Sequence, residues 1–223
     1  MPIFLMDTFG SASIGVFLKV TDKFIIAPPQ IAETKLRKLE GWFKIQGIRA
    51  NISGSVLVGC LACANSNGVI LPHHVRDEEI TALKSLSDVN IAIAETKRTA
   101  YGNLILTNDH GAIVDPRLGK EDMKMVSDTL GVEVSSGEIG GLPYVGSLAT
   151  ATNKGAMSHP MIKPEEQALL KDVLKVPVGV GTINCGIPYI ATGLIGNSNV
   201  AVAGSLTTGP ELFMIEEALG VTD

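Results

Sequence analysis

The sequence predicts an α/β protein that folds as one closed ring of five ββαβ units. Three features of the 223 residues predict it. Glycines and prolines recur with a period of about 44 residues, the apolar runs beside them look like buried strands, and a strand-like run at the N-terminus matches a strand that the last unit lacks. A fixed period of this length is typical of proteins built from one small repeated unit.

The repeat is clearest in the middle of the chain. Two glycines nine residues apart bracket a strand and a polar turn, and a second strand then runs to a proline; the pairs are Gly59 with Gly68, Gly102 with Gly111, and Gly146 with Gly155. Weaker copies place Gly15 and Phe24 at these positions in the first unit, and Ile190 and Asn199 in the fifth. We therefore expect residues 1–223 to form a single domain of five repeats.

The local chemistry predicts two strands joined by a tight turn in each unit. Glycines such as Gly68, Gly111 and Gly155 follow polar residues, where a tight turn would use the positive φ that glycine tolerates. The strands, for example Leu104–Leu106, are nearly continuous apolar runs, which indicates burial on both faces.

A helix and a third strand complete each unit. Acidic residues such as Asp77–Glu79 mark helix starts because they complement the positive end of the helix dipole, and Thr208 with Glu211 fits a capping box. The fifth helix extends to Val221, which leaves no third strand after it. We expect Ile3–Met6 to supply that strand and close the ring, leaving no open sheet edge.

Composition limits the kinds of function. Apolar residues make up 45%, enough for a large core, and the net charge of −5 argues against binding that depends mainly on neutralising phosphates. No apolar run approaches the roughly 20 residues of a membrane helix, so we expect no membrane association. Three cysteines at uneven spacing suit a reducing compartment, which predicts a cytoplasmic protein.

No strong metal or cofactor motif is present, and we expect neither group to be bound. Cys60 and Cys63 are expected on one strand, where alternate side chains point to opposite faces, so they would be hydrophobic fillers. His73 and His74 are adjacent on a predicted loop and lack further ligands nearby.

The five-unit ring resembles the pentein fold, or β/α-propeller, which is shared by guanidino-modifying enzymes and by the initiation factor six family of ribosome anti-association factors. The phrases that resemble the second group are Tyr101–Asn108, Val145–Ser147 with Thr152–Gly155, and Leu206–Leu212 with Ile215–Leu219. The resemblance extends from Gly15 to Leu219 and is closest to archaeal members, since no polar tail follows the last helix.

This resemblance implies a non-enzymatic protein that binds the large ribosomal subunit and sterically prevents association with the small one. It further implies roles in translation initiation and large-subunit biogenesis, and contacts with a ribosomal protein and the sarcin-ricin loop region of the rRNA. The free protein is expected to be a monomer. The alternative is a guanidino-modifying hydrolase or transferase with Cys185 as nucleophile, assembled with His159 and Glu138.

The repeat also suggests which residues share a face. The residue that follows the first of the two glycine positions in each unit should lie at the same height on the ring, where the first strand of the unit begins. These residues are Val16, Cys60, Asn103, Ser147 and Ala191. Together with Asn65, they are the candidate residues of the ribosome-binding face. Eukaryotic members of the family tend to have a basic residue where this chain has Cys60, so the resemblance does not carry a direct phosphate contact over to this position.

Overall fold

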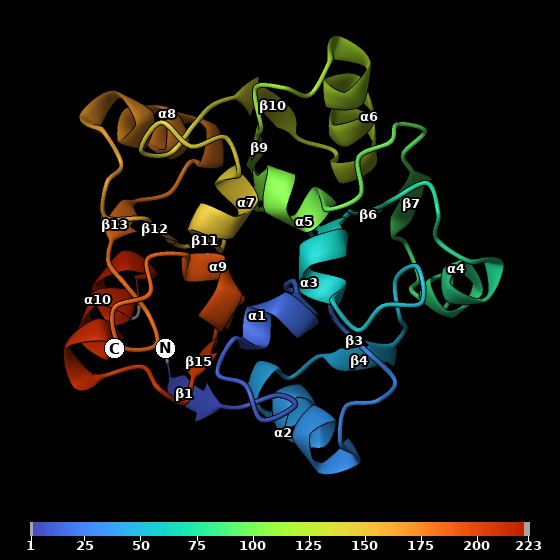
Figure 1. The fold of residues 1–223 in the computed structure, drawn as a ribbon, viewed down its shortest axis with the longest axis horizontal. Coiled ribbons are helices and arrows are strands. Elements are labelled where there is room, and N and C mark those ends of the chain that lie inside the picture. Colours follow the sequence, from blue (N-terminus) through green and yellow to red (C-terminus); the bar gives the residue numbers. More distant parts are fainter. Residues whose placement is uncertain (1, 221–223) are drawn as a thin grey trace.

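The computed structural model describes residues 2–220, and within that range five three-stranded sheets alternate with helices around a central axis (Figure 1). Each unit has a short inner helix, two antiparallel strands, an outer helix, and a third strand parallel to the second. The first unit has α1 (Ile14–Phe17), β2 (Lys19–Val20), β3 (Phe24–Ala27), α2 (Glu33–Phe43) and β4 (Gln46–Arg49). The second has α3 (Val58–Leu61), β5 (Cys63–Ala64), β6 (Gly68–Leu71), α4 (Asp77–Leu83) and β7 (Asn90–Ile93).

The remaining three units follow the same plan. The third has α5 (Tyr101–Leu104), β8 (Ile105–Thr107), β9 (Gly111–Val114), α6 (Lys120–Leu130) and β10 (Glu133–Ser136). The fourth has α7 (Val145–Leu148), β11 (Ala149–Ala151), β12 (Ala156–Ser158), α8 (Pro164–Leu174) and β13 (Val178–Val180). The fifth has α9 (Ile190–Gly193), β14 (Leu194–Gly196), β15 (Ala201–Gly204) and α10 (Gly209–Ala218), and its third strand is β1 (Ile3–Met6).

Pairing of the two ends of the chain closes the ring, which confirms the role predicted for the N-terminal strand. Strand β1 lies parallel to β15, with Ile3 opposite Ala201 and Met6 opposite Gly204. The ring of Phe4 stacks on Trp42 of α2, with 4.4 Å between ring centroids, and so joins β1 to the first unit. Each of the five sheets is thereby complete within the described residues.

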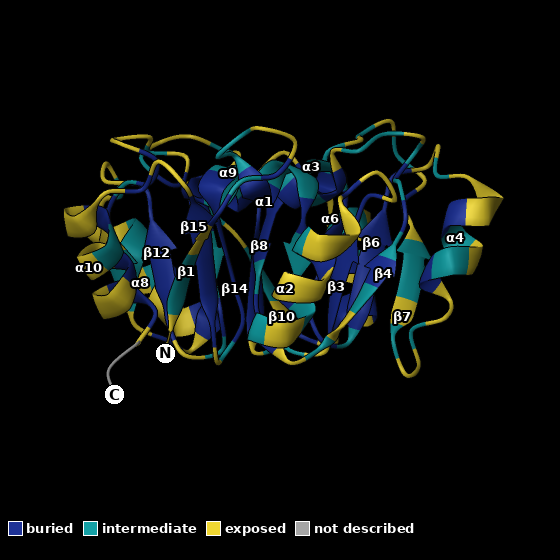
Figure 2. Cartoon of the chain, turned by 90° about the horizontal axis from the view of Figure 1, so that it is seen from below, coloured by how far each residue is buried: buried dark blue, intermediate teal, exposed yellow. Residues whose placement is uncertain are grey.

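The core runs as a belt between neighbouring units. Strands β3, β6, β9 and β15 are buried at every residue, as the continuous apolar runs predicted. Figure 2 shows this for β3, β6 and β15. One cluster packs Val200 and Val202 of the fifth unit against Leu36 and Leu39 of the first. Since a unit buries its apolar side chains partly against its neighbour, no unit has a complete core of its own.

The hairpin glycines have a different role from the one predicted. Gly68, Gly111 and Gly155 are not among the residues with positive φ, so the prediction from turn geometry was wrong. A Cβ at these positions would lie 2.2, 2.1 and 2.2 Å from the carbonyl oxygens of Thr129, Val173 and Ala218 respectively. Glycine is needed here because the hairpin of one unit presses against the helix of the next.

A second set of glycines packs the five short inner helices against one another. A Cβ on Gly59 would lie 1.8 Å from the carbonyl oxygen of Gly15, and one on Gly102 would lie 2.0 Å from that of Gly59. A Cβ on Gly146 would lie 2.3 Å from the carbonyl oxygen of Gly102, and one on Gly15 would lie 2.0 Å from that of Ala191. These helices are a correction to the prediction, which began each first strand directly after this glycine. They also place Cys60 on α3 and only Cys63 on a strand.

The packing corrects the register of the fifth unit by one residue. Ala191, and not Ile190, occupies the position of the inner glycines, and Val200, and not Asn199, accepts the turn hydrogen bond from Asn197. The cause is an extra residue before α9. Ile183 bridges to Ile187, whereas the equivalent bridges, such as Ile52 to Ser55, span one residue fewer.

No helix in residues 2–220 is long and apolar enough to cross a membrane.

The glycine contacts predict a sharp difference between two substitutions. Gly59→Ala should lower the free energy of unfolding by about 3 kcal/mol or more, because the new methyl group meets backbone that cannot move without displacing a neighbouring unit. Gly41→Ala is the matched control: it lies in α2 with no atom within 4 Å of the added Cβ, and should raise stability by about 0.5–1 kcal/mol. Urea unfolding measures both, and equal stability of the two variants would contradict the account.

Candidate binding face

The strand directions give the ring two different ends. We call one the loop face: it carries the short inner helices, the loops that lead into them, and the turns that follow the middle strands. Short helices α1, α3 and α9 lie together at this end, beneath a layer of loops (Figure 2). The other, the turn end, carries the five hairpin turns of residues 21–23, 65–67, 108–110, 152–154 and 197–199.

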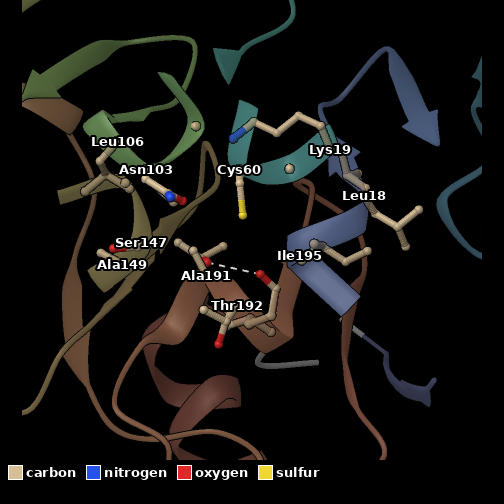
Figure 3. Close-up of a pocket in the computed structure, with 18 of the residues that line it drawn as sticks. Leu18, Lys19, Cys60, Asn103, Leu106, Ser147, Ala149, Ala191, Thr192 and Ile195 are labelled. Atoms are coloured by element: carbon tan, nitrogen blue, oxygen red, sulfur yellow. Dashed lines mark hydrogen bonds between the residues drawn. The ribbon is translucent and has the colours of Figure 1, made fainter. Parts of the chain in front are cut away.

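Five of the predicted site residues come together on the loop face. Val16, Cys60, Asn103, Ser147 and Ala191 lie on the five short helices and line one axial cavity (Figure 3). Because the fifth unit is shifted by one residue, the strict equivalent of Asn103 there is Thr192, which also lines the cavity. These residues therefore lie around the same level of the ring, as the repeat predicted.

Asn65 does not share this face, which is a correction to the candidate set. It is buried in the turn end, where its side-chain Nδ2 donates to the carbonyl oxygens of Asn108 and Leu130 at 3.1 and 2.9 Å. Asn108 repeats the arrangement toward Thr152 and Leu174 in the next unit. These amides join neighbouring units and leave no group free for a partner.

The axial cavity is narrow, and apolar atoms make up more of its lining than polar ones. Its volume of about 70 Å³ has room for a few waters. The hydroxyls of Ser147 and Thr192 donate to the carbonyl oxygens of Tyr144 and Tyr189, the residues just before their short helices, at 2.8 and 2.7 Å. At the turn end, the amide Nδ2 of Asn153 bridges the carboxylates of Asp22 and Asp109 at 2.8 and 2.7 Å.

Cys60 is placed in the cavity wall but is not activated as a nucleophile. Its side chain points into the space between the short helices (Figure 3). Burial raises the pKa of the Cys60 thiol, and this outweighs the opposing effects of the nearby Lys19 ammonium and of the hydrogen bond from Asn103. The neutral thiol therefore dominates at neutral pH, and thiols are poor nucleophiles in that form.

The three residues of the hydrolase alternative do not form a catalytic group. Cys185 lies in an exposed turn with φ of 65°, and its backbone N–H donates to Glu211. His159 is buried, its Nδ1 accepts the backbone N–H of Met161 at 3.1 Å, and burial lowers its pKa. Among the described residues, no hydrogen bond joins the Cys185 thiol to His159 or Glu138, and no group of three His, Cys, Asp or Glu side chains could hold a metal ion.

Carboxylates at the starts of three outer helices anchor loops of the loop face. Glu79 accepts the backbone N–H groups of Ser53 and Gly54, each at 2.7 Å. Glu166 holds Gly140 and Gly141 in the same way, and Glu211 holds Cys185 and Gly186. The sequence revealed the capping role of Glu211, which the structure confirms, but not this second role. A glutamate at the third helical position downstream of a glycine turn was the available signal.

One carboxyl among these anchors is strongly perturbed. Burial alone would raise the pKa of Glu211, but hydrogen bonds from the backbone of Thr208 and Gly186 and the hydroxyls of Thr182 and Thr208 outweigh it and lower the pKa to about 2. The ionised form is therefore the one that the folded loop requires.

The rim of the loop face carries exposed apolar side chains. The large ones are Phe9, Leu57, Leu142, Tyr144, Met161, Ile187, Tyr189 and Leu206. Tyr144 also receives the Arg117 guanidinium, 4.6 Å from the centre of its ring. Aromatic side chains, methionine and arginine are the residue types enriched at protein interfaces.

The fold and the loop face define a class of protein. It is a closed five-unit α/β ring that presents a broad surface of loops and short helices around a narrow axial opening. The chain belongs to the eIF-6 family, whose model matches residues 3–218. That is the family of translation initiation factor 6, a non-enzymatic factor.

Archaeal relatives match over nearly the whole chain. Translation initiation factor 6 of Pyrococcus furiosus is 47% identical over 99% of both chains, and that of Pyrococcus abyssi is 42% identical over 99% of this chain and 100% of its own. The factor of Nitrosopumilus maritimus is 44% identical, with 98% and 99% covered. Among solved structures, C. jejuni agmatine deiminase shows a weak likeness, with a TM-score of 0.39 and 12% identity over 60% of this chain and 50% of its own.

The lowered pKa of Glu211 predicts a pH dependence of stability. A depressed pKa contributes stability above the ordinary value of 4.5, and this contribution is lost as the pH falls toward about 2. Glu211→Gln should therefore cost about 1.5–3 kcal/mol at pH 6, and the difference from the parent should shrink between pH 4.5 and 2. Thermal melts across this range measure it, with Glu216→Gln, exposed on the same helix, as control. A constant difference at every pH would contradict the anchoring role.

Proposed function

We propose that the chain binds the large ribosomal subunit with its loop face and sterically prevents the small subunit from joining. The observation that carries this proposal is the full-length match to the eIF-6 family and to relatives named translation initiation factor 6. We extend it to the roles inferred for the family, which are translation initiation and large-subunit biogenesis.

The geometry supports a steric mechanism. The inner glycine contacts and the shared core make the five units one stiff body, because a shift of one unit would move backbone in the next. A stiff ring that covers part of the intersubunit surface needs no catalytic step to exclude a second large particle. The net charge of −5 fits a binding mode in which phosphate neutralisation is secondary to shape and apolar contact.

Several further features belong to the same proposal. We assign the ring to the pentein fold on its five closed ββαβ units. The partners on the large subunit are a ribosomal protein and the sarcin-ricin loop region of the rRNA. The free chain is a cytoplasmic monomer.

Sedimentation of purified subunits tests the function. With the chain in excess under magnesium conditions that favour association, the fraction of whole ribosomes should fall, and the chain should migrate with the large subunit alone. An unchanged yield of whole ribosomes, with no chain in the large-subunit peak, would refute the proposal.

A pair of variants tests which end of the ring binds. Asn103→Lys places a charge at the centre of the loop face, where it must lose water on binding, so affinity for the large subunit should fall by about 2 kcal/mol, or roughly 30-fold. Asn199→Lys makes the same change at the exposed turn end and should leave affinity unaltered. Thermal melts confirm that both are folded. The reverse order of affinities would assign binding to the turn end.

A further inference from the structure

The exposed apolar side chains of the loop face are not spread evenly around the ring. Each middle strand is followed by a four-residue turn, in which the backbone N–H of the fourth residue donates to the carbonyl oxygen of the first. In the first unit Ile31 donates to Pro28, and in the fourth unit Ile162 donates to His159. The third residue of this turn is, in unit order, Gln30, His74, Arg117, Met161 and Leu206. It is polar or charged in the first three units and apolar in the last two.

The residue before each short helix shows a related asymmetry. In unit order these residues are Ser13, Leu57, Ala100, Tyr144 and Tyr189. The fourth and fifth units thus add two exposed tyrosines to the two apolar turn residues, and their neighbouring loops add Leu142 and Ile187. We call these six residues of the fourth and fifth units the apolar arc. Exposed fractions are 71% for Met161 and 63% for Leu206, against 48% and 47% for the tyrosines.

Contacts within the structure join the segments that carry the arc. Gly140 packs on Met161: a Cβ added to Gly140 would lie 3.1 Å from the backbone carbonyl oxygen of Met161. The ring of His159 meets Tyr189 edge-on with 6.1 Å between centroids, which joins the fourth unit to the fifth. Thr207, next to Leu206, accepts the backbone N–H of Asn184 in the loop that leads to Ile187.

The loops that carry the arc are held rigid. Glu166 accepts the N–H groups of Gly140 and Gly141 at 2.6 and 3.2 Å, and Glu211 accepts those of Cys185 and Gly186 at 3.1 and 2.8 Å. Apolar side chains presented on rigid loops lose little conformational freedom on binding, which favours affinity. An exposed apolar surface of this kind marks a contact with another macromolecule.

The charges around the arc select the kind of partner. Residues 137–144, 159–166, 181–189 and 205–208 contain Glu138, Glu165 and Glu166 but only one basic residue, Lys163. The Arg117 guanidinium also lies against Tyr144, but it forms an ion pair with Asp115, so it adds no net charge to the arc. This balance repels phosphate groups and offers no fork of arginines for a nucleic-acid backbone. It is complementary to a polypeptide that carries apolar side chains flanked by lysine or arginine.

We propose that the apolar arc is the part of the loop face that takes a protein of the large subunit, through a segment with apolar and basic side chains, and not rRNA. This inference rests on the proposed function and deepens it, because it assigns one class of partner to one part of the face.

Site-specific photo-crosslinking to purified large subunits tests the proposal. In Met161→p-benzoylphenylalanine, irradiation of the complex should give a product that protease degrades and that survives ribonuclease. Lys154→p-benzoylphenylalanine, at the exposed turn end of the same unit, is the matched control and should give no product. A product that ribonuclease removes, or one that contains two copies of this chain, would overturn the proposal.

Affinity measurements supply an independent arm. Met161→Ala combined with Tyr189→Ala should weaken binding to the large subunit at least tenfold and leave its salt dependence unchanged, since no phosphate contact is lost. Gln30→Ala, at the position equivalent to Met161 in the first unit, should change affinity by less than about twofold. Normal affinity of the double variant would refute the inference while leaving the function intact, whereas failure of the parent chain to co-sediment would refute the function itself.

Discussion

The close approach of backbone to backbone around the axis is the constraint on which the rest of the structure depends. At four of the five inner positions a glycine lies so near the carbonyl oxygen of the preceding unit that a Cβ would come within 1.8–2.3 Å of it. The hairpin glycines repeat the constraint farther out, where Gly68, Gly111 and Gly155 meet the helix of the next unit. Together the two sets bind every unit to its neighbours, so the ring behaves as one body and not as five hinged parts.

That packing determines what the loop face can present. Because the short helices are held at one height, Cys60, Asn103 and Ser147 surround a single opening. Around them, the carboxylates of Glu79, Glu166 and Glu211 fix three of the loops through backbone hydrogen bonds. The result is a preformed surface, and preformed surfaces bind with little rearrangement.

Much of the fold could be predicted from the sequence because its regularities are local or periodic. The apolar run Ile3–Met6 predicted ring closure, since only a strand there could complete the fifth sheet, and its pairing with Ala201–Gly204 confirms it. The ββαβ order and the capping role of Glu211 were equally accessible. Each of these depends on the character of a short segment and its place in the repeat.

The errors concern contacts between units, which a single sequence does not display. The hairpin glycines were assigned to turn geometry because a turn is visible locally, whereas the carbonyl of Thr129 or Val173 comes from another unit. The sequence places the fifth unit one residue early, because Ile190 keeps the regular period of about 44 residues. The extra residue lies in the loop from Ile183 to Ile187, and only the β-bridge between these two residues reveals it. Asn65 was placed on the wrong end for the same reason, as its partners are the backbone oxygens of Asn108 and Leu130.

Electron cryomicroscopy of the chain bound to the large ribosomal subunit tests the central claim most directly, because one map reports both the orientation and the stiffness of the ring. The account predicts that the short helices and their loops face the subunit, that the hairpin turns point away, and that the backbone of the five units matches the free ring to within about 1 Å. A ring that contacts the subunit through its hairpin turns, or whose units have separated at the glycine contacts, would contradict it.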